Sequence, residues 1–266
     1  MSIILITGAT DGIGLETAQR LARLGHELVL HGRSEAKAAR ARDAVLAQSP
    51  GAKLHTAHAD LADLGEVVRM ANSLNALLPR LDVLLNNAGV YMAERKDSRD
   101  GFEMTLAVNH LAHFLLTALL LPLLKKSAAP RVVTVSSVAH MSGRIAFDNL
   151  NSERHFDGYA AYANSKLANA LFAAELARRE PWLASNSLHP GVIDTKLLHA
   201  GFDMAGASVR SGAQTSVYLA TSAEVKGISG KYFDDCKITP PLAAVNDPRL
   251  AQQLWAWSEQ AIGTAL

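Results

Sequence analysis

Short apolar runs alternate with longer segments of helical periodicity along most of the 266-residue chain. The runs are apolar almost throughout, as in the Ile3-Ile4-Leu5-Ile6 stretch, and predict strands that are buried on both faces. In the longer segments apolar residues recur every three to four positions, which predicts helices. The predicted strands are residues 3–7, 27–31, 53–58, 82–86, 131–136, 184–189 and 231–233. The predicted helices include residues 14–24, 35–48, 64–77, 102–121 and 159–179.

This alternation predicts an α/β chain with a single-domain Rossmann fold: a doubly wound, mostly parallel, seven-stranded sheet with helices on both faces. No repeat or Pro/Gly-rich linker divides the sequence, so residues 1–266 are expected to form one domain. Residues 139–158 and 192–209 interrupt the alternation, and each stretch follows a predicted strand. Both are therefore expected at the carboxyl edge of the sheet, as loops that shape a substrate site.

Composition narrows the class of protein. Hydrophobic residues make up 49% of the chain and charged residues 19%, so a large core is expected and disorder is not. The formal net charge of +1 gives no electrostatic attraction for nucleic acid or an anionic membrane. None of the 10 histidines has a spacing typical of zinc ligands, so no metal site is predicted.

The remaining sequence signals predict a cytoplasmic protein. The single cysteine, Cys236, cannot form an internal disulfide, which is typical of a reducing compartment. The N-terminus enters an apolar strand without the basic segment of a signal peptide. The most apolar stretch, residues 111–124, contains His113 and Pro122 and falls short of the roughly 20 apolar residues of a membrane span. We therefore expect a buried helix there and no membrane partner.

A glycine-rich turn follows the first predicted strand and leads into the first helix. Its pattern is Gly-x-x-x-Gly-x-Gly, and glycines allow a tight turn and close approach of a pyrophosphate to the backbone. The free N–H groups at the start of the helix then favour a bound anion. A purely structural turn is the alternative. The predicted phosphate-binding residues are Gly8, Thr10, Asp11, Gly12, Ile13 and Gly14.

The end of the second predicted strand indicates which dinucleotide binds. Enzymes that use NAD usually carry an acidic residue there, which binds the ribose 2′-hydroxyl. This chain has His31, Gly32 and Arg33 instead, and a guanidinium suits a 2′-phosphate. NADP(H) is therefore predicted in preference to NAD(H). The alternative is that Arg33 only heads a solvated helix.

Tyr162 and Lys166 are four residues apart in a predicted helix, so they share one face. Lowering a tyrosine pKa from about 10 to about 7 requires roughly 4 kcal/mol in favour of the phenolate. One ammonium about 4 Å away supplies an energy of that size at an effective dielectric of about 20. The pair is thus suited to general acid/base chemistry, although the same spacing also arises in purely structural helices. Tyr159 is the competing tyrosine, two turns from the lysine.

Taken together, these motifs resemble the short-chain dehydrogenase/reductase family along nearly the whole chain. The matching segments, in the family's order, are residues 7–14, Asp60-Leu61, Asn86-Asn87-Ala88-Gly89, Asn109, Ser136-Ser137, Tyr162 to Lys166, and Pro190-Gly191. Ser-Ser-Val-Ala-His at 136–140, Gly-Arg-Ile-Ala-Phe at 143–147 and residues 229–236 resemble the retinol dehydrogenase and WW-domain oxidoreductase branch. The segment between Ser137 and Tyr162 is longer than in most members, so a differently shaped pocket is expected.

The resemblance implies a catalytic set of four residues. Tyr162 would protonate the carbonyl oxygen, and Lys166 would bind the nicotinamide ribose and lower the tyrosine pKa. Ser137 would hydrogen-bond the substrate oxygen, in preference to Ser136, and Asn109 would hold a water of a proton relay. The further cofactor-binding residues implied by the resemblance are Asp60, Leu61, Asn87, Ala88, Gly89, Pro190, Gly191, Ile193 and Thr195.

The expected function is an NADP(H)-dependent oxidoreductase that interconverts a hydrophobic aldehyde or ketone and an alcohol. The alternative is a protein of the same fold that senses NADP(H) without catalysis, although such proteins usually lose the tyrosine or the lysine. The helices at 102–121 and 159–179 are apolar around most of their circumference, and the corresponding helices of this family often form a dimer. A homodimer is therefore also expected.

Overall fold

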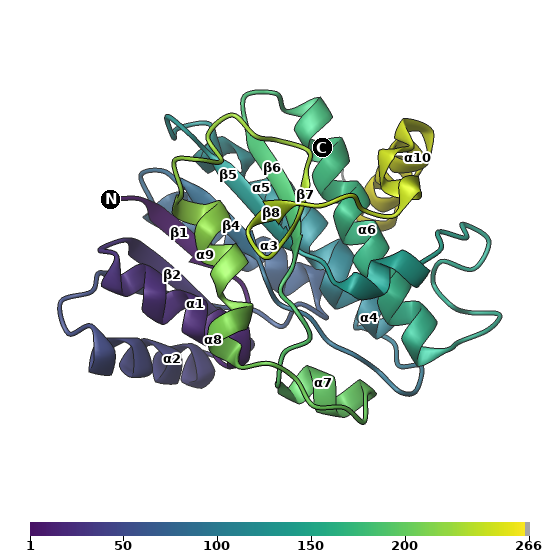
Figure 1. The fold of residues 1–266 in the computed structure, drawn as a ribbon, viewed down its shortest axis with the longest axis horizontal. Coiled ribbons are helices and arrows are strands. Elements are labelled where there is room, and N and C mark those ends of the chain that lie inside the picture. Colours follow the sequence, from purple (N-terminus) through teal and green to yellow (C-terminus); the bar gives the residue numbers. More distant parts are fainter. Residues whose placement is uncertain (264–266) are drawn as a thin grey trace.

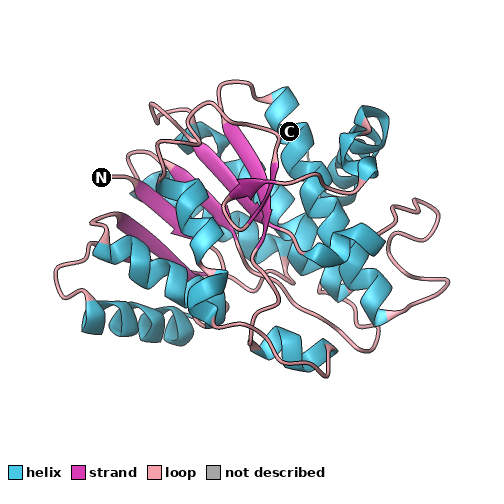
Figure 2. Ribbon diagram, in the orientation of Figure 1, coloured by secondary structure: helices cyan, strands magenta, loops and turns pink. Residues whose placement is uncertain are grey.

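The computed structural model describes residues 1–263, in which eight strands form one sheet (Figure 1 and Figure 2). The strands are β1 (Ile3–Ile6), β2 (Glu27–Gly32), β3 (Leu54–His58), β4 (Val83–Asn86), β5 (Arg131–Val135), β6 (Ala184–His189), β7 (Tyr232–Asp234) and β8 (Lys237–Ile238). Their spatial order is β3-β2-β1-β4-β5-β6-β7-β8. All neighbours are parallel except β7 and β8. The order reverses between β1 and β4, which is where open α/β sheets bind ligands.

Helices connect the parallel strands and cover both faces of the sheet (Figure 2). The longer helices are α1 (Gly12–Arg23), α2 (Glu35–Gln48), α3 (Leu64–Leu77), α5 (Ala112–Leu124), α6 (Gly158–Arg179), α9 (Gln214–Thr221) and α10 (Pro248–Ile262). The shorter segments are α4 (Met104–Leu106), α7 (Lys196–Gly201), α8 (Val209–Gly212), the π-helix η1 (Ala107–Leu111) and the 3-10 helices η2 (Val138–Ser142) and η3 (Ala243–Asn246).

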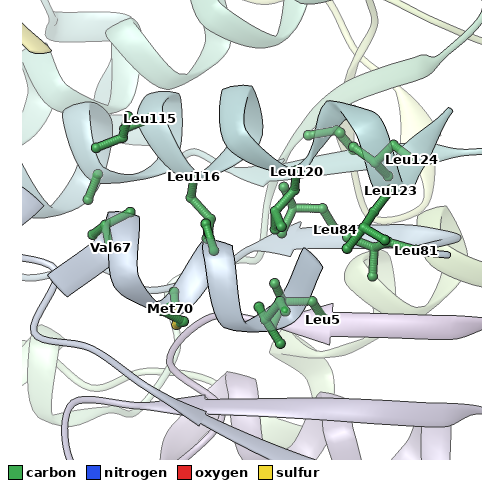
Figure 3. Packing of buried hydrophobic residues seen from close by; sticks show 14 of the residues in the cluster. Leu5, Val67, Met70, Leu81, Leu84, Leu115, Leu116, Leu120, Leu123 and Leu124 are labelled. Atoms are coloured by element: carbon green, nitrogen blue, oxygen red, sulfur yellow. The ribbon is translucent and has the colours of Figure 1, made fainter. Parts of the chain in front are cut away.

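The two faces of the sheet bury alternate residues of each strand, as the period of two along a strand requires. In β1, Ile4 and Ile6 pack in the cluster under α1, α2 and α9, whereas Leu5 packs in the cluster under α3 and α5. Figure 3 shows this second cluster, with Leu116 and Leu120 of α5 between α3 and the sheet. Both faces are covered, so the apolar runs of the sequence correspond to buried strands.

The predicted strands agree with the structure to within one residue at each end, but the predicted number is wrong. The eighth strand, β8, pairs with β7 in an antiparallel hairpin. Its turn residues Asp235 and Cys236 have φ of 46° and 61°. A strand of two exposed residues, Lys237 and Ile238, has no apolar pattern that a sequence could display. The other predicted features of the fold class are confirmed.

The apolar helix is longer than the sequence predicts. It begins at Met104 rather than at residue 102, and it continues through Pro122 to Leu124. This run of 21 residues is long and apolar enough, by length and composition, to cross a membrane, which corrects the expectation that it falls short. Its most apolar window is 78% buried inside the fold, as in the core helix of a globular domain.

The C-terminal helix α10 packs on this core through an aromatic cluster. Trp255 is 3% exposed and lies 4.9 Å from Phe114 of α5 and 5.8 Å from Phe172 of α6, measured between ring centroids. The helix begins at Pro248, and the Asp247 carboxylate accepts hydrogen bonds from the backbone N–H groups of Arg249 and Leu250. The circumference of α6 is thus largely covered within one chain.

We expect Trp255→Ala to lower the free energy of unfolding by about 3–5 kcal/mol, because it empties a packed aromatic site. Trp182→Ala is the matched control, since Trp182 is 36% exposed and its loss should cost less than about 1 kcal/mol. Urea unfolding followed by circular dichroism measures both. Equal losses for the two variants would contradict the assigned role of the cluster.

Candidate active site

The glycine-rich turn between β1 and α1 has the backbone geometry of a tight loop. Gly8 and Gly12 have φ of +64° and +51°, the left-handed region that favours glycine. A Cβ atom at Gly14 would lie 2.2 Å from the carbonyl oxygen of Gly8, so only glycine fits there. The Asp11 carboxylate accepts a hydrogen bond from the N–H of Gly12 and caps α1.

A cleft of about 1440 Å³ opens at the carboxyl ends of the strands and begins at this turn. It continues past the ends of β4, β5 and β6 to the first half of α6. The residues predicted from the sequence that line it are Gly8, Thr10, Asp11, Gly12, Ile13, Gly14, Arg33, Asp60, Leu61, Asn87, Ala88, Gly89, Ser137, Tyr162, Lys166, Pro190, Gly191, Ile193 and Thr195. One continuous cleft therefore joins the glycine turn to the tyrosine–lysine pair.

Tyr162 and Lys166 face this cleft from the same side of α6, and both are buried. The Lys166 Nζ donates a hydrogen bond of 3.2 Å to the carbonyl oxygen of Val135 at the end of β5. It lies 5.6 Å from the centroid of the Tyr162 ring. The same carbonyl accepts a second bond, of 3.1 Å, from the Asn169 side chain. The side chains of α6 thus fix the helix against the sheet edge.

Burial determines the proton affinities of this pair. It raises the pKa of Tyr162 to about 12 and lowers the pKa of Lys166 to about 8. A hydrogen bond with Ser137 acts in the opposite direction on the Tyr162 pKa, but burial outweighs it. The predicted depression of the tyrosine pKa by Lys166 is therefore wrong for the protein alone. The prediction counted the attraction of an ammonium and omitted the cost of removing a phenolate from water.

The two adjacent serines are placed differently. The Ser136 hydroxyl donates a hydrogen bond of 2.7 Å to the backbone carbonyl of Lys166, which ties it to α6. The Ser137 Oγ accepts a hydrogen bond of 3.2 Å from the N–H of Ala139 and caps η2. Its O–H lies on the side of Tyr162, with which it can form a hydrogen bond. Of the two hydroxyls, only that of Ser137 is placed to donate into the cleft.

Asn109 lies behind the cleft and is fully buried. Its side-chain oxygen accepts a bond from Val90 N–H at 2.8 Å, and its amide nitrogen donates to the Val90 carbonyl at 3.1 Å and to the Ser165 hydroxyl at 3.0 Å. Both amide hydrogens are thus used by the protein. The π-helix η1 directs this side chain onto the segment after β4, and the expected role of Asn109 in holding a water of a proton relay stays a prediction.

Two aromatic residues that the sequence does not single out, Tyr91 and Phe202, pack against Tyr162, and Phe202 lines the cleft. An aromatic wall surrounds Tyr162: the Phe202 ring lies 5.4 Å from Tyr91, 6.0 Å from Tyr159 and 6.3 Å from Tyr162. A Cβ atom at Gly201 would lie 2.8 Å from the Tyr91 ring, so the end of α7 packs directly on that ring. These contacts join three distant segments, and no sequence motif marks them.

Lys37 is a further residue that the sequence did not single out. It lies in the first turn of α2, lines the cleft together with Arg33, and both side chains are exposed. The Ser34 hydroxyl accepts a hydrogen bond from Lys37 N–H and caps α2. The spacing of four residues between Arg33 and Lys37 at the start of a helix is the signal that could have identified this second cation.

Within residues 1–263, no group of three His, Cys, Asp or Glu side chains is placed to hold a metal ion.

The loops predicted at 139–158 and 192–209 contribute to the cleft in part. Ala139, Met141 and Ser142 of the first loop line it, and the second loop lines it from Val192 through His199 and again at Phe202, Met204 and Val209. Six other residues of the first loop, together with the start of α6, line a separate small cavity of about 100 Å³: Ala146, Asn149, Leu150, Ser152, His155 and Asp157.

These features define a dinucleotide-binding α/β protein with a buried tyrosine–lysine pair at the end of the cleft. A family model described as short chain dehydrogenase matches residues 2–206, and the chain belongs to this family. Retinol dehydrogenase 14 of Mus musculus is 42% identical over 98% of this chain and 85% of its own length. The polyprenol dehydrogenase of Mus musculus is 41% identical over 96% of this chain and 82% of its own length.

Solved structures agree with this assignment. A short chain dehydrogenase from Escherichia coli CFT073, solved in complex with NADPH, has a TM-score of 0.72 and 28% identity, and the match covers 89% of this chain and 97% of that chain. The resemblance to the retinol dehydrogenase branch is confirmed by the relatives that match along almost the full chain.

Lys166→Met is expected to stabilise the folded protein at pH 7. A pKa lowered from 10.5 to about 8 corresponds to about 3 kcal/mol that the charged form costs the folded state. Because the folded-state pKa is depressed, this cost is absent above pH 10.5 and grows as the pH falls to about 8. The Val135 carbonyl keeps its bond from Asn169 in the variant.

Urea unfolding at several pH values between 7 and 10.5 measures this effect. The wild type should gain stability relative to Lys166→Met as the pH rises through this window. The exposed Lys126 provides the matched control, and Lys126→Met should leave the pH dependence of the wild type unchanged. A Lys166→Met variant that is less stable than the wild type at pH 7 would contradict the burial cost.

Proposed function

We propose that the protein is an NADP(H)-dependent oxidoreductase that interconverts a hydrophobic aldehyde or ketone and the corresponding alcohol. The observation that carries the proposal is the meeting of Tyr162, Lys166 and Ser137 in the same cleft as the glycine turn. Membership of the short chain dehydrogenase family supports an oxidoreductase, and the names of the relatives support an alcohol or carbonyl substrate.

The residues present fit a nicotinamide dinucleotide. Gly8, Gly12 and Gly14 line the cleft without side chains, which lets a pyrophosphate approach the backbone closely. Asp60 and Leu61 would flank the adenine, and Asn87 to Gly89 would line the channel. Pro190, Gly191, Ile193 and Thr195 would lie along the nicotinamide half. When bound, the reduced cofactor supplies the hydride that adds to the carbonyl carbon.

The proposed preference for NADP(H), the cofactor with a 2′-phosphate, rests on the positive charge of two side chains. Arg33 and Lys37 place two cations at the end of the cleft where β2 finishes, and β2 ends in His31 and Gly32 without an acidic residue. A phosphate between two cations gains charge-assisted hydrogen bonds, whereas a ribose hydroxyl would gain little from them. The solved relative in complex with NADPH is consistent with this choice.

Tyr162 supplies the proton in the direction of reduction. Its pKa of about 12 in the free protein keeps the phenol protonated, which is the form that donates to the carbonyl oxygen. Ser137 donates a hydrogen bond to the same oxygen, where negative charge develops. Transfer of the proton from the Tyr162 Oη to the carbonyl oxygen would leave a phenolate on Tyr162.

Lys166 stabilises that phenolate. Its pKa of about 8 keeps the amine mostly charged at pH 7, and its ammonium lies on the same face of α6 as the phenol. The attraction that the sequence predicted is thus expected to act when the phenolate forms. Asn109 supports the site indirectly. Its side chain binds the backbone of Val90 and thereby fixes Gly89, which lies next to the Lys166 amine.

An apolar substrate is favoured by the wall around Tyr162. Tyr91 and Phe202 contact the Tyr162 ring, and Tyr159 contacts Phe202. Phe202, Tyr159 and the exposed side chains of Met141 and Met204 line the cleft. Contact with hydrocarbon is favourable for aromatic and methionine side chains.

The expected homodimer and the cytoplasmic location remain predictions. Within the chain, α10 and α3 already cover much of the surface of α6 and α5 that suggested a dimer.

Tyr162→Phe should lower kcat for NADPH-dependent reduction of an aliphatic aldehyde by about 10²- to 10⁴-fold, because the proton donor is lost. NADPH affinity, measured by fluorescence titration, should change less than about threefold. Tyr159→Phe is the matched control and should retain most of the activity. Full activity of Tyr162→Phe would refute the mechanism, and NADPH binding without turnover of any carbonyl by the wild type would favour the non-catalytic sensor.

Arg33→Asp should weaken NADPH binding by about tenfold to hundredfold and leave NADH binding nearly unchanged, because the lost contact is made only to the 2′-phosphate. Arg40→Asp carries the same change of charge on an exposed residue of α2 outside the cleft and serves as the control. Titrations with both cofactors measure the preference. An unchanged NADPH-to-NADH ratio in Arg33→Asp would show that Arg33 does not select the cofactor.

A further inference from the structure

The segment that carries Ser137 is held by two buried histidines from different elements. The carbonyl oxygen of Ser137 lies 2.7 Å from Nδ1 of His140, a residue of η2. The N–H of Val138, which belongs to the same peptide unit, donates a bond of 3.1 Å to Nδ1 of His189 at the end of β6. Both polar ends of the peptide between Ser137 and Val138 are therefore bound by imidazole rings.

The partners of His140 determine where its ring proton lies. A backbone carbonyl only accepts, so Nδ1 must donate to the Ser137 oxygen. Leu242 N–H only donates, so Nε2, 3.1 Å away, must accept. His140 is therefore a neutral ring with its proton on Nδ1. Its ring also packs on Tyr232 of β7, with centroids 4.5 Å apart.

His189 requires the opposite tautomer. Its Nδ1 accepts from Val138 N–H, which leaves the ring proton on Nε2. His189 lines the cleft, as do Pro190 and Gly191 directly after it. Burial lowers the pKa of both histidines, which favours the neutral rings that these bonds require. The His140 ring thus donates to the carbonyl oxygen of this peptide unit, and the His189 ring accepts from its N–H.

The held peptide sets the direction of the Ser137 hydroxyl. The N–H of Ala139 occupies one lone pair of the Ser137 Oγ, which turns the O–H away from η2. This arrangement holds only while the backbone at Ser137 keeps its extended φ of −164°. A rotation of the peptide between Ser137 and Val138 would move the Ala139 N–H that follows it and so redirect the Ser137 hydroxyl.

We propose that His140 and His189 are positioning residues that clamp the Ser137–Val138 peptide and thereby orient the Ser137 hydroxyl toward the substrate oxygen. The inference rests on the proposed function for its effect on catalysis, whereas the clamp itself is a property of the free protein. Through Leu242 and Tyr232, His140 also connects the C-terminal part of the fold to the active site.

The tautomers provide a test that needs no substrate. Long-range proton–nitrogen spectra of the full chain with ¹⁵N-labelled histidine distinguish the two neutral tautomers, and His140→Asn and His189→Asn assign the signals among the 10 histidines. At pH 7 we expect His140 with its proton on Nδ1 and His189 with its proton on Nε2. A charged ring or the opposite tautomer at either position would overturn the clamp.

Two matched variants separate the bonds of His140. The amide nitrogen of asparagine takes the place of Nδ1, so His140→Asn keeps the bond to the Ser137 carbonyl and loses the one to Leu242. Glutamine reaches the place of Nε2, so His140→Gln keeps the bond from Leu242 and loses the one to Ser137. We expect kcat for decanal with NADPH to fall at least about tenfold in His140→Gln and less than about threefold in His140→Asn.

NADPH affinity should stay within about threefold of wild type in both variants, because neither bond reaches the cofactor site directly. Equal values of kcat in the two variants, or the reverse order, would overturn the positioning role. If either variant fails to fold, His189→Asn and His189→Leu repeat the test: the asparagine oxygen can still accept from Val138 N–H, so only the leucine variant should lose kcat.

The two proposals fail in different ways. A wild type that binds NADPH but reduces no aldehyde or ketone would refute the proposed function, and the tautomer spectra would still decide whether the clamp exists. An active wild type with the wrong tautomers would refute the clamp and leave the oxidoreductase function standing.

Discussion

The carbonyl oxygen of Val135, at the end of β5, accepts hydrogen bonds from both Lys166 and Asn169 of α6. These two bonds fix the depth and rotation of a 22-residue helix against the edge of the sheet. Tyr162, one turn before Lys166, consequently faces the cleft beside the carboxyl end of β5. The Lys166 amine that makes one of these bonds is buried, and burial makes its charged form electrostatically unfavourable. The same amine is expected to take part in the chemistry of the site.

That cost explains why the free protein and the reacting protein differ. Without a neighbouring negative charge, burial favours a neutral phenol at Tyr162 and weakens the proton affinity of Lys166. Once the phenol gives up its proton, the same low-dielectric surroundings strengthen the attraction between phenolate and ammonium. Burial thus disfavours the Lys166 ammonium while Tyr162 is neutral, and it strengthens the attraction once the Tyr162 phenolate has formed. Tyr162 therefore stays protonated until it donates its proton in reduction.

Much of the fold could be predicted because its causes are local. The apolar runs of β1 and β4 and the periodicity of α2 and α3 follow from which faces are buried, and their ends were predicted to within a residue. The two-residue strand β8 could not be predicted, because its pairing depends on β7 and a turn with positive φ. The helix from Met104 to Leu124 extends past Pro122 because packing against α3 and the sheet supports its last turn.

The sequence by itself determined the order of the motifs and the residue types of the site: the glycines of the turn, Arg33 after β2 and the four-residue spacing of Tyr162 and Lys166. Tertiary structure alone decided how these side chains are solvated and bonded. It buried the tyrosine–lysine pair, turned Ser136 toward α6 and Ser137 toward the cleft, and brought His140 and His189 to one peptide. The physical reason is that spacing fixes neighbours along one element, whereas desolvation and hydrogen bonds between elements depend on segments that are distant in the chain.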